Sequence, residues 1–424
     1  MGTSPIPPRT SASRRAFIAT SLAAVGAVTV PAVARAAAGA PARPRRVPAR
    51  TPATMSFDLV NNTGSDTVYA FVTGYAVNNG NALTLLLSDG HTPYYPPSPS
   101  QPLSPVGADV AIPLAAPGGT RQITVPQLAG ARLWFSVGGT IEFLLNPGPA
   151  LVQPSVSNPS DPNINLAWDF CEFTLNATQL FADTSCVDFV CLPIGMTLTD
   201  TLGGAQTVHG LPPGGLDTVC NGLKVQAAKD GQGWDHLIVT SGGQNLRALS
   251  PYNGMVINSS LFSGYYEPYV AQVWQKYSTT TLTIDTQESY GHVGGQVSGG
   301  QLTFPGVASF AQPSTADIFS CSSGPFNSAG LGVEALAILA RLAAAFNRST
   351  LLFAANQPNG AKPRSYYQHS PTNHYARIVH ATAVGHLGYA FPYDDVTKSG
   401  GVNQSGPVSS GSPSVLTVTV GPQH

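Results

Sequence analysis

Short apolar or alternating runs, separated by Gly, Pro and Asn, fill residues 55–202 of this 424-residue chain, and they constrain the fold more than any other feature. Apolar or alternating runs bounded by turn-forming residues are typical of β-strands. Many short strands at regular spacing predict a sandwich or a barrel. The expected strands are 68–72, 83–87, 110–114, 122–125 and 132–137.

The pattern changes at about residue 205. Apolar residues at helical spacing predict helices over 216–228, 267–277 and 332–346, with strand-like runs at 236–240, 281–285 and 301–304 between them. From Tyr366 the chain is expected to return to strands, the last at 415–420. We therefore predict a mainly β fold with an α/β insertion. A β-domain is formed by 55–205 with 366–424, a mixed α/β domain by 206–365, and a wide groove between them holds a polymer.

The first 54 residues have the composition of a targeting segment and a linker. SRRAFI at 13–18 is typical of a twin-arginine export signal, and an apolar run over 17–31 follows it. We assign 1–38 to a signal peptide and 39–54, rich in Pro and Arg, to a linker. The alternative is a disordered basic tail. The signal predicts a protein that is secreted to the extracellular space.

Charge and cysteine content limit the partners of the chain. Residues 1–50 hold 8 of the 20 Lys and Arg and none of the 21 Asp and Glu, which leaves 12 basic and 21 acidic residues, a net charge of −9. An acidic chain argues against nucleic acid and anionic membranes as partners, and it suits a neutral polysaccharide. Five cysteines, none in CxxC spacing, leave at least one thiol free in a monomer, with one or two disulfides possible. His369, His374 and His380 lack metal-ligand spacing, so we expect no metal and no cofactor.

Two carboxylates stand inside apolar runs of the segment 168–196. Alternation over the first run places Glu172, Thr174 and Asn176 on one face, opposite an apolar face of Cys171, Phe173 and Leu175. Asp188 lies in a second run, CVDFVCL, and FADTS at 181–185 is a plausible turn between the two. If the runs pair, both carboxylates point to one cleft, as hydrolysis of a glycosidic bond requires.

Plainer interpretations of this segment stay open. A Glu in a strand is commonly a solvent-facing residue, and an Asp near a turn commonly accepts local hydrogen bonds. Asp183 is a rival acid, although it lies in the expected turn. Thr174 and Asn176 either bind sugar hydroxyls or are ordinary polar strand residues. Three aromatic residues either stack on sugar rings or serve the core and turns: Phe181, Tyr94 and Tyr95.

Several stretches resemble known families. EFTLN and VDFVCLPI, the opening DLVNNTG at 58–64 and the closing GYAFPYDDV at 388–396 are similar to thaumatin-like proteins. More closely, the chain from about residue 55 to its end resembles the bacterial β-1,3-glucanases of glycoside hydrolase family 64. The resembling stretches are SDGHTPYYPPSPS, GADVAIPL, LWFSVGG, FLLNPGPALVQPSVSNPSDPNIN, GLDTVC, SGGQNLRALSP and TNHYARIVHA.

The resemblance implies both a fold and a mechanism. It implies a thaumatin-like β-sandwich or barrel and an acid and base sixteen residues apart, as Glu172 and Asp188 are. Glu172 is then the general acid and Asp188 the general base of an inverting, endo-acting enzyme. We expect the protein to be a monomer. The implied substrate is β-1,3-glucan such as laminarin, curdlan or fungal cell wall, cut to short oligosaccharides, notably pentasaccharides. Asp394 and Asp395 match the closing motif, and we interpret them as structural. The alternative function is a thaumatin-like protein that binds β-glucan without cutting it.

Overall fold

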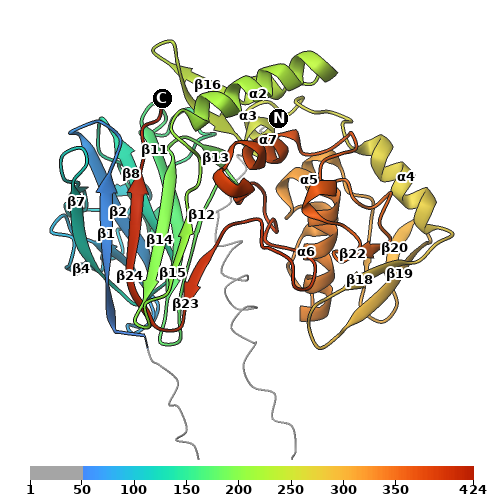
Figure 1. Cartoon of the computed structure of the whole chain (residues 1–424), viewed down its shortest axis with the longest axis horizontal. Helices are drawn as coiled ribbons and strands as arrows, with labels where there is room; N and C mark the ends of the chain where they lie inside the picture. Colours follow the sequence, from blue (N-terminus) through green and yellow to red (C-terminus); the bar gives the residue numbers. More distant parts are fainter. Residues whose placement is uncertain (1–50) are drawn as a thin grey trace, which may run out of the picture.

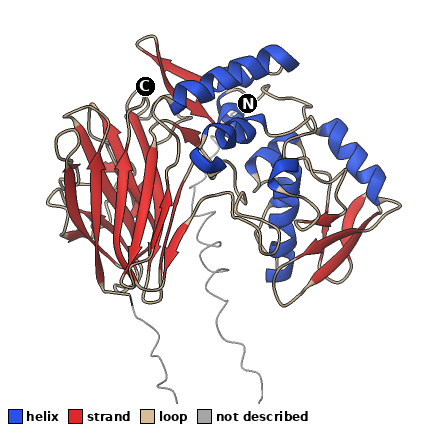
Figure 2. Ribbon diagram, in the orientation of Figure 1, coloured by secondary structure: helices blue, strands red, loops and turns tan. Residues whose placement is uncertain are grey.

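The computed structural model describes residues 51–424. The predicted signal peptide and most of the predicted linker lie outside these residues. The described chain has strands gathered on one side and helices with short strands on the other (Figures 1 and 2). No helix within residues 51–424 is long and apolar enough to cross a membrane.

The first side is built from two large sheets that pack face to face. The smaller one contains, in spatial order, β15 (Ala205–Val208), β14 (Ile194–Asp200), β24 (Pro413–Val420), β1 (Thr54–Asn61) and β7 (Thr120–Pro126). The larger one contains β23 (Val408–Ser410), β12 (Leu180–Thr184), β11 (Ala167–Leu175), β8 (Leu128–Val137), β2 (Val68–Ala76), β3 (Ala82–Leu86) and β4 (Pro93–Tyr94), with β6 (Ile112–Pro113) on β2. The first and last long strands, β1 and β24, pair in parallel. The two ends of the described chain therefore meet in one sheet.

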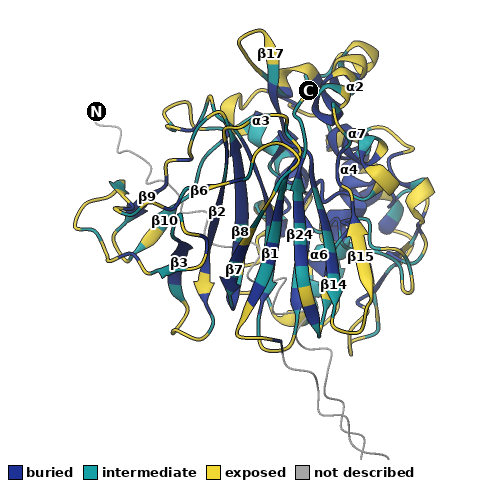
Figure 3. Cartoon of the chain, turned by 60° about the vertical axis from the view of Figure 1, so that its left-hand side comes forward, coloured by how far each residue is buried: buried dark blue, intermediate teal, exposed yellow. Residues whose placement is uncertain are grey.

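Alternating side chains fill the space between these sheets. In β1 every second residue is buried, Phe57 and Leu59 among them, and Figure 3 shows the resulting alternation of buried and half-buried bands along β1, β24 and β14. Phe57 meets Phe173 of β11 edge to face, with ring centroids 5.1 Å apart. This contact joins the inner faces of the two sheets, so Cys171, Phe173 and Leu175 face the core, as their alternation predicted.

The other face of the large sheet is covered at one end only. Phe71, Trp134, Trp168 and Phe170 point away from the sandwich core and are nevertheless buried. Aromatic rings from outside the sheet cover them: Phe143 packs on Phe71 and Trp134, and Phe189 packs on Trp168. β11 consequently has four buried residues in a row, Trp168 to Cys171, before alternation begins.

The second side holds the helices and two small sheets. The helices are α2 (Gly215–Asp230), α3 (Pro251–Ile257), α4 (Glu267–Tyr277), α5 (Thr315–Ser320), α6 (Val333–Asn347) and α7 (His374–Thr382), with 3₁₀ turns at Trp234–Leu237, Gly324–Phe326, Pro363–Ser365 and Val384–His386. The strands of the two sheets are β13 (Phe189–Val190), β17 (Gln244–Leu249) and β16 (Ile238–Ser241), then β21 (Ala308–Phe310), β20 (Gln301–Phe304), β19 (His292–Ser298), β18 (Leu282–Asp285) and β22 (Asn356–Gln357). A further sheet of β10 (Ala150–Val152), β9 (Leu144–Asn146) and β5 (Ser104–Pro105) flanks the sandwich.

The three predicted helices are confirmed as α2, α4 and α6, and the last predicted strand, 415–420, is confirmed within β24, but the prediction that strands begin at Tyr366 was wrong. Residues 366–407 form α7, one 3₁₀ turn and loops, and strands resume only at Val408. Tyr375, Ile378 and Val379 bury one helical face, and Asn373 caps the helix by accepting a hydrogen bond from the Ala376 N–H at 3.0 Å. The expected strand 110–114 is also reduced to Ile112–Pro113.

Candidate active site

A row of side chains at one level crosses the outer face of the large sheet. Directly opposed residues of antiparallel strands project on the same side of a sheet. Glu172 of β11 opposes Arg132 of β8 on one side and Asp183 of β12 on the other. Arg132 in turn opposes Thr73 of β2. The strand register therefore assembles Thr73, Arg132, Glu172 and Asp183 in a line.

Glu172 is fixed within this row by an ion pair. The Arg132 Nε donates to Glu172 Oε1 at 3.0 Å, and the two side chains are only 19% and 16% exposed. Arg132 also donates to Gln153 Oε1. Its guanidinium lies 4.3 Å from the centroid of the Phe170 ring, a cation–π contact that restricts the planar group. Glu172 thus lies where the aromatic cover of this face ends, half-buried and held in one orientation.

The prediction that FADTS forms a turn was wrong. Phe181 to Thr184 belong to β12, which pairs directly with β11, and the turn lies earlier in the chain. Asn176 forms it, because its Oδ1 accepts hydrogen bonds from Thr178 N at 2.9 Å and Gln179 N at 3.1 Å. Asn176 was the available signal, since Asn favours such turns. Asp183, expected in a loop, instead lies beside Glu172.

Asp188 does not lie on the neighbouring strand as predicted. It precedes β13, two residues that pair with β17 in a different sheet. The Asp188 carbonyl accepts hydrogen bonds from Ser250 N and Asn253 Nδ2, both at 2.9 Å. The next residue, Phe189, places its ring 6.2 Å from that of Phe170, two residues before Glu172 on the same face. Asp188 is therefore positioned by the helical side of the molecule, beside the aromatic cover of the Glu172 face.

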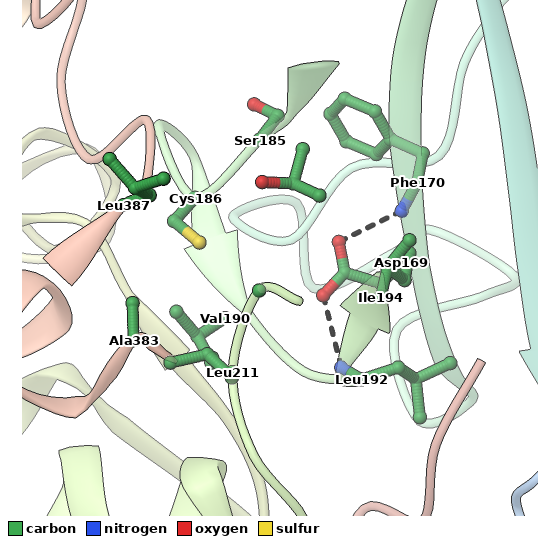
Figure 4. A pocket seen from close by; sticks show the side chains of 13 residues that line it. Asp169, Phe170, Ser185, Cys186, Val190, Leu192, Ile194, Leu211, Ala383 and Leu387 are labelled. Atoms are coloured by element: carbon green, nitrogen blue, oxygen red, sulfur yellow. Dashed lines mark hydrogen bonds between the residues drawn. The ribbon is translucent and has the colours of Figure 1, made fainter. Parts of the chain in front are cut away.

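A buried carboxylate ties β11 to the segment that carries Asp188. Asp169 accepts hydrogen bonds from Phe170 N at 2.8 Å, Cys191 N at 2.9 Å and Leu192 N at 3.0 Å. Figure 4 shows this carboxylate beside a cavity of about 20 Å³, into which Cys186 also points. Burial raises the pKa of Asp169 to about 7, although the three N–H groups oppose the shift. A cavity of this size holds about one water molecule.

The predicted sugar-binding residues fall into two groups. Thr174 and Phe181 oppose each other on the Glu172 face and are both half-buried. Tyr94 belongs to the edge strand β4 of the same sheet, and its hydroxyl donates to the Val106 carbonyl at 3.1 Å. Tyr95 is 44% exposed. Asn176 has its carbonyl oxygen engaged in the turn, so its structural role is the better supported one.

The remaining polar clusters have structural partners. Asp394 is fully buried between Arg348 at 2.9 Å and His380 at 2.8 Å. Burial works against ionisation of Asp394, but the neighbouring His380 and Arg348 hold its pKa below the usual value. None of the five cysteines, all of which lie within residues 51–424, forms a disulfide. Within residues 51–424 no three His, Cys, Asp or Glu side chains are grouped as metal ligands. A second pocket, of about 640 Å³ and lined partly by Lys224 and His236, includes neither Glu172 nor Asp188.

Comparison with known proteins connects this arrangement to a family. A model of the family described as β-1,3-glucanase matches residues 53–420. The glucan endo-1,3-β-glucosidase of Cellulosimicrobium cellulans is 29% identical over 397 residues, 92% of this chain and 68% of that protein. The corresponding protein of Arthrobacter sp. (strain YCWD3) is 28% identical over the same shares.

Solved structures agree. A laminaripentaose-producing β-1,3-glucanase in complex with laminaritetraose matches with a TM-score of 0.78 and 32% identity, over 88% of this chain and 100% of that one. A family 64 β-1,3-glucanase domain from Clostridium beijerinckii, at 20% identity, shares the fold with a TM-score of 0.68, over 88% of this chain and 100% of that one. The class defined by fold and family is glycoside hydrolase. The chain belongs to family 64, the β-1,3-glucanases, which confirms the resemblance found in the sequence.

Proposed function

We propose that this chain is a secreted, endo-acting β-1,3-glucan hydrolase that inverts the anomeric centre. The family match supports β-1,3-glucan as substrate, and the related structure of a laminaripentaose-producing enzyme supports short products, notably the pentasaccharide. Laminarin, curdlan and fungal cell walls are the polymers to test. The twin-arginine motif at 13–18 supports secretion. We further propose that the enzyme acts as a monomer and that its sandwich is a thaumatin-like domain.

One observation supports the site most strongly. Glu172 is a half-buried carboxylate on the outer face of the large sheet, held by Arg132 at 3.0 Å where the aromatic cover ends. Such a group is shielded enough to keep a defined orientation and open enough to meet a polymer. We place the glucan across this face, beside Thr174 and Phe181, between the sandwich and the helical side. The hydroxyl and the ring are suited to sugar hydroxyl groups and to a sugar face, respectively.

In this single-displacement mechanism, one carboxyl group acts as general acid and the other as general base. Glu172 donates its proton to the departing glycosidic oxygen. Asp188 accepts a proton from a water molecule, which attacks the anomeric carbon from the opposite side and inverts it. This arrangement requires about 6.5–9.5 Å between the carboxyl groups, so that the water fits. Because Asp188 belongs to the helical side and Glu172 to the sandwich, the packing of the two sides determines the distance between their carboxyl groups.

Substitution of the pair tests the proposal. Glu172→Gln and Asp188→Asn should each lower turnover of laminarin by roughly 10²–10⁴-fold, since each removes one proton transfer. Glu288→Gln, at an exposed position on the helical side, is the matched control and should leave turnover unchanged. Reducing sugar is the readout, and sedimentation with insoluble curdlan measures binding. A folded Glu172→Gln variant with a third of wild-type activity would remove Glu172 from the mechanism.

The same assays separate the enzyme from the alternative, a protein that binds β-glucan without cutting it. Binding without any release of reducing sugar by the wild-type chain would favour that alternative. Proton NMR during early hydrolysis tests the stereochemistry, and the α-anomer should appear first. The β-anomer as first product would indicate retention, which would require Asp188 to act as something other than a base.

A further inference from the structure

Asp183 lies beside Glu172 in the candidate active site, yet the proposed mechanism assigns it no role. It opposes Glu172 directly across β11 and β12, and directly opposed Cβ atoms lie about 4.5–5.5 Å apart. Asp183 is 7% exposed. Glu172 therefore has a cation on one strand neighbour, Arg132, and a carboxyl group on the other.

This arrangement poses a problem for a general acid. The Arg132 guanidinium, at 3.0 Å, favours the ionised form of Glu172, whereas an acid must keep its proton until the glycosidic bond breaks. A second carboxyl group at close range has the opposite effect, because two neighbouring negative charges repel. With one cation and two carboxyl groups, the row is neutral when a single proton is retained.

Beyond the row, the proposed base Asp188 brings a further carboxylate toward Glu172 from the segment before β13, and a second negative charge there favours retention of the proton as Asp183 does. On β8 and β12, the strands packed against β11, Arg132 and Asp183 are the titratable or charged residues that share the Glu172 face. Gln153, beyond Arg132, is uncharged. On β11 itself, Asp169 and Cys171 lie on the opposite face.

We propose that Asp183 and Glu172 form a carboxyl pair that shares one proton near neutral pH, and that Asp183 is the positioning residue that keeps this proton available to Glu172. The inference rests on the proposed function. In the reaction the proton passes from Glu172 to the glycosidic oxygen as the bond to the anomeric carbon breaks. The pair is then doubly ionised beside Arg132. It regains a proton from solvent after product leaves, while Asp188 releases the proton that it took from water.

The pH profile of an Asp183→Asn variant tests the proposal. Asn preserves size but removes the negative charge, so Glu172 beside Arg132 should lose its proton at lower pH. The alkaline limb of kcat/KM should shift down by about one to two pH units, with KM nearly unchanged. Asp183→Glu should restore most of the profile. Arg132→Gln should move the alkaline limb in the opposite direction, because it removes the cation that favours ionisation.

Each outcome is decisive. An alkaline limb of folded Asp183→Asn that overlays the wild-type limb overturns the inference, and so does loss of activity at every pH, which would make Asp183 the acid itself. If the variant does not fold, carboxyl ¹³C NMR of the wild type replaces it. One site titration near neutral pH coupled to a second supports the pair, whereas two independent titrations near pH 4 overturn it. Activity retained by Glu172→Gln would refute the proposed function instead.

Discussion

Replacement of Asp169 by Asn gives a test of how the site is held together. The carboxylate accepts three backbone hydrogen bonds, one from its own strand and two from Cys191 and Leu192. Asn has a single acceptor oxygen. The least costly orientation turns that oxygen toward Cys191 and Leu192 and leaves the Phe170 N–H facing an amide NH₂. One buried donor without a partner costs about 1–3 kcal/mol.

The cost should depend on pH because the wild-type carboxyl group titrates. Burial raises the pKa of folded Asp169 to about 7, above the unfolded value of 3.8. A raised folded pKa stabilises the protein fully below the unfolded pKa, and that stabilisation is lost as pH rises through the folded pKa. At about 1.4 kcal/mol per pH unit, the wild type loses roughly 2–3 kcal/mol between pH 5 and pH 8 through this group. The Asn variant has no such dependence.

Urea denaturation followed by tryptophan fluorescence measures the effect. Asp169→Asn should be destabilised relative to wild type at pH 5, and the deficit should shrink or vanish at pH 8. Exposed Asp235→Asn serves as control and should show no such change. A deficit that is equal at both pH values, or larger at pH 8, would refute the assignment of the raised pKa to Asp169. Because Cys191 and Leu192 follow Asp188 closely, we also expect kcat to fall more than KM rises.

Two further predictions concern the interior. Asp394→Ala leaves Arg348 and His380 buried without their carboxylate and should lower the free energy of unfolding by about 3–5 kcal/mol. Asp395→Asn changes a carboxyl group whose Oδ1 has no hydrogen-bond partner, so it should change the free energy of unfolding far less. Urea denaturation of both variants is the measurement. Denatured protein without reductant should react with Ellman's reagent at five thiols per chain, because none of the cysteines forms a disulfide. Native protein should react slowly, because four of the five are buried. Fewer than five reactive thiols in the denatured protein would show a disulfide.

The sequence predicts those parts of the fold that depend on local periodicity. α4 was predicted over its full length, because Val270, Val273, Trp274 and Tyr277 repeat at helical spacing and all are buried. The polar face of β11 was predicted for the same reason, since alternation is a local property. α7 was missed. Its buried face is short, and the helix depends on Asn373 as a cap and on packing against the rest of the helical side.

The strand register around Glu172 could not be predicted. It depends on where the β11–β12 turn lies: the structure places it at NATQ, 176–179, whereas the sequence analysis placed it at FADTS, 181–185. A turn at FADTS displaces the pairing and removes Asp183 from the site. Because register determines which residues share a face, an error in the turn changes the composition of the site even when every strand is recognised. The position of Asp188 depends on contacts with Ser250 and Asn253, which lie more than sixty residues away.

The sequence of β11 nevertheless contains the reason why a carboxylate is tolerated at Glu172. Its first half, Trp168 to Cys171, is buried on both faces, and its second half alternates between buried and half-buried residues. Glu172 is the first residue on the outer face beyond the two-sided cover. Two residues earlier on the same face, at Phe170, a charge would be enclosed by Trp134 and Phe189 and would lose most of its hydration. Two residues later, at Thr174, a charge would face Phe181 without an opposing cation. At Glu172, Arg132 supplies the counter-charge, and the open side of the sheet leaves the carboxyl group within reach of a polymer.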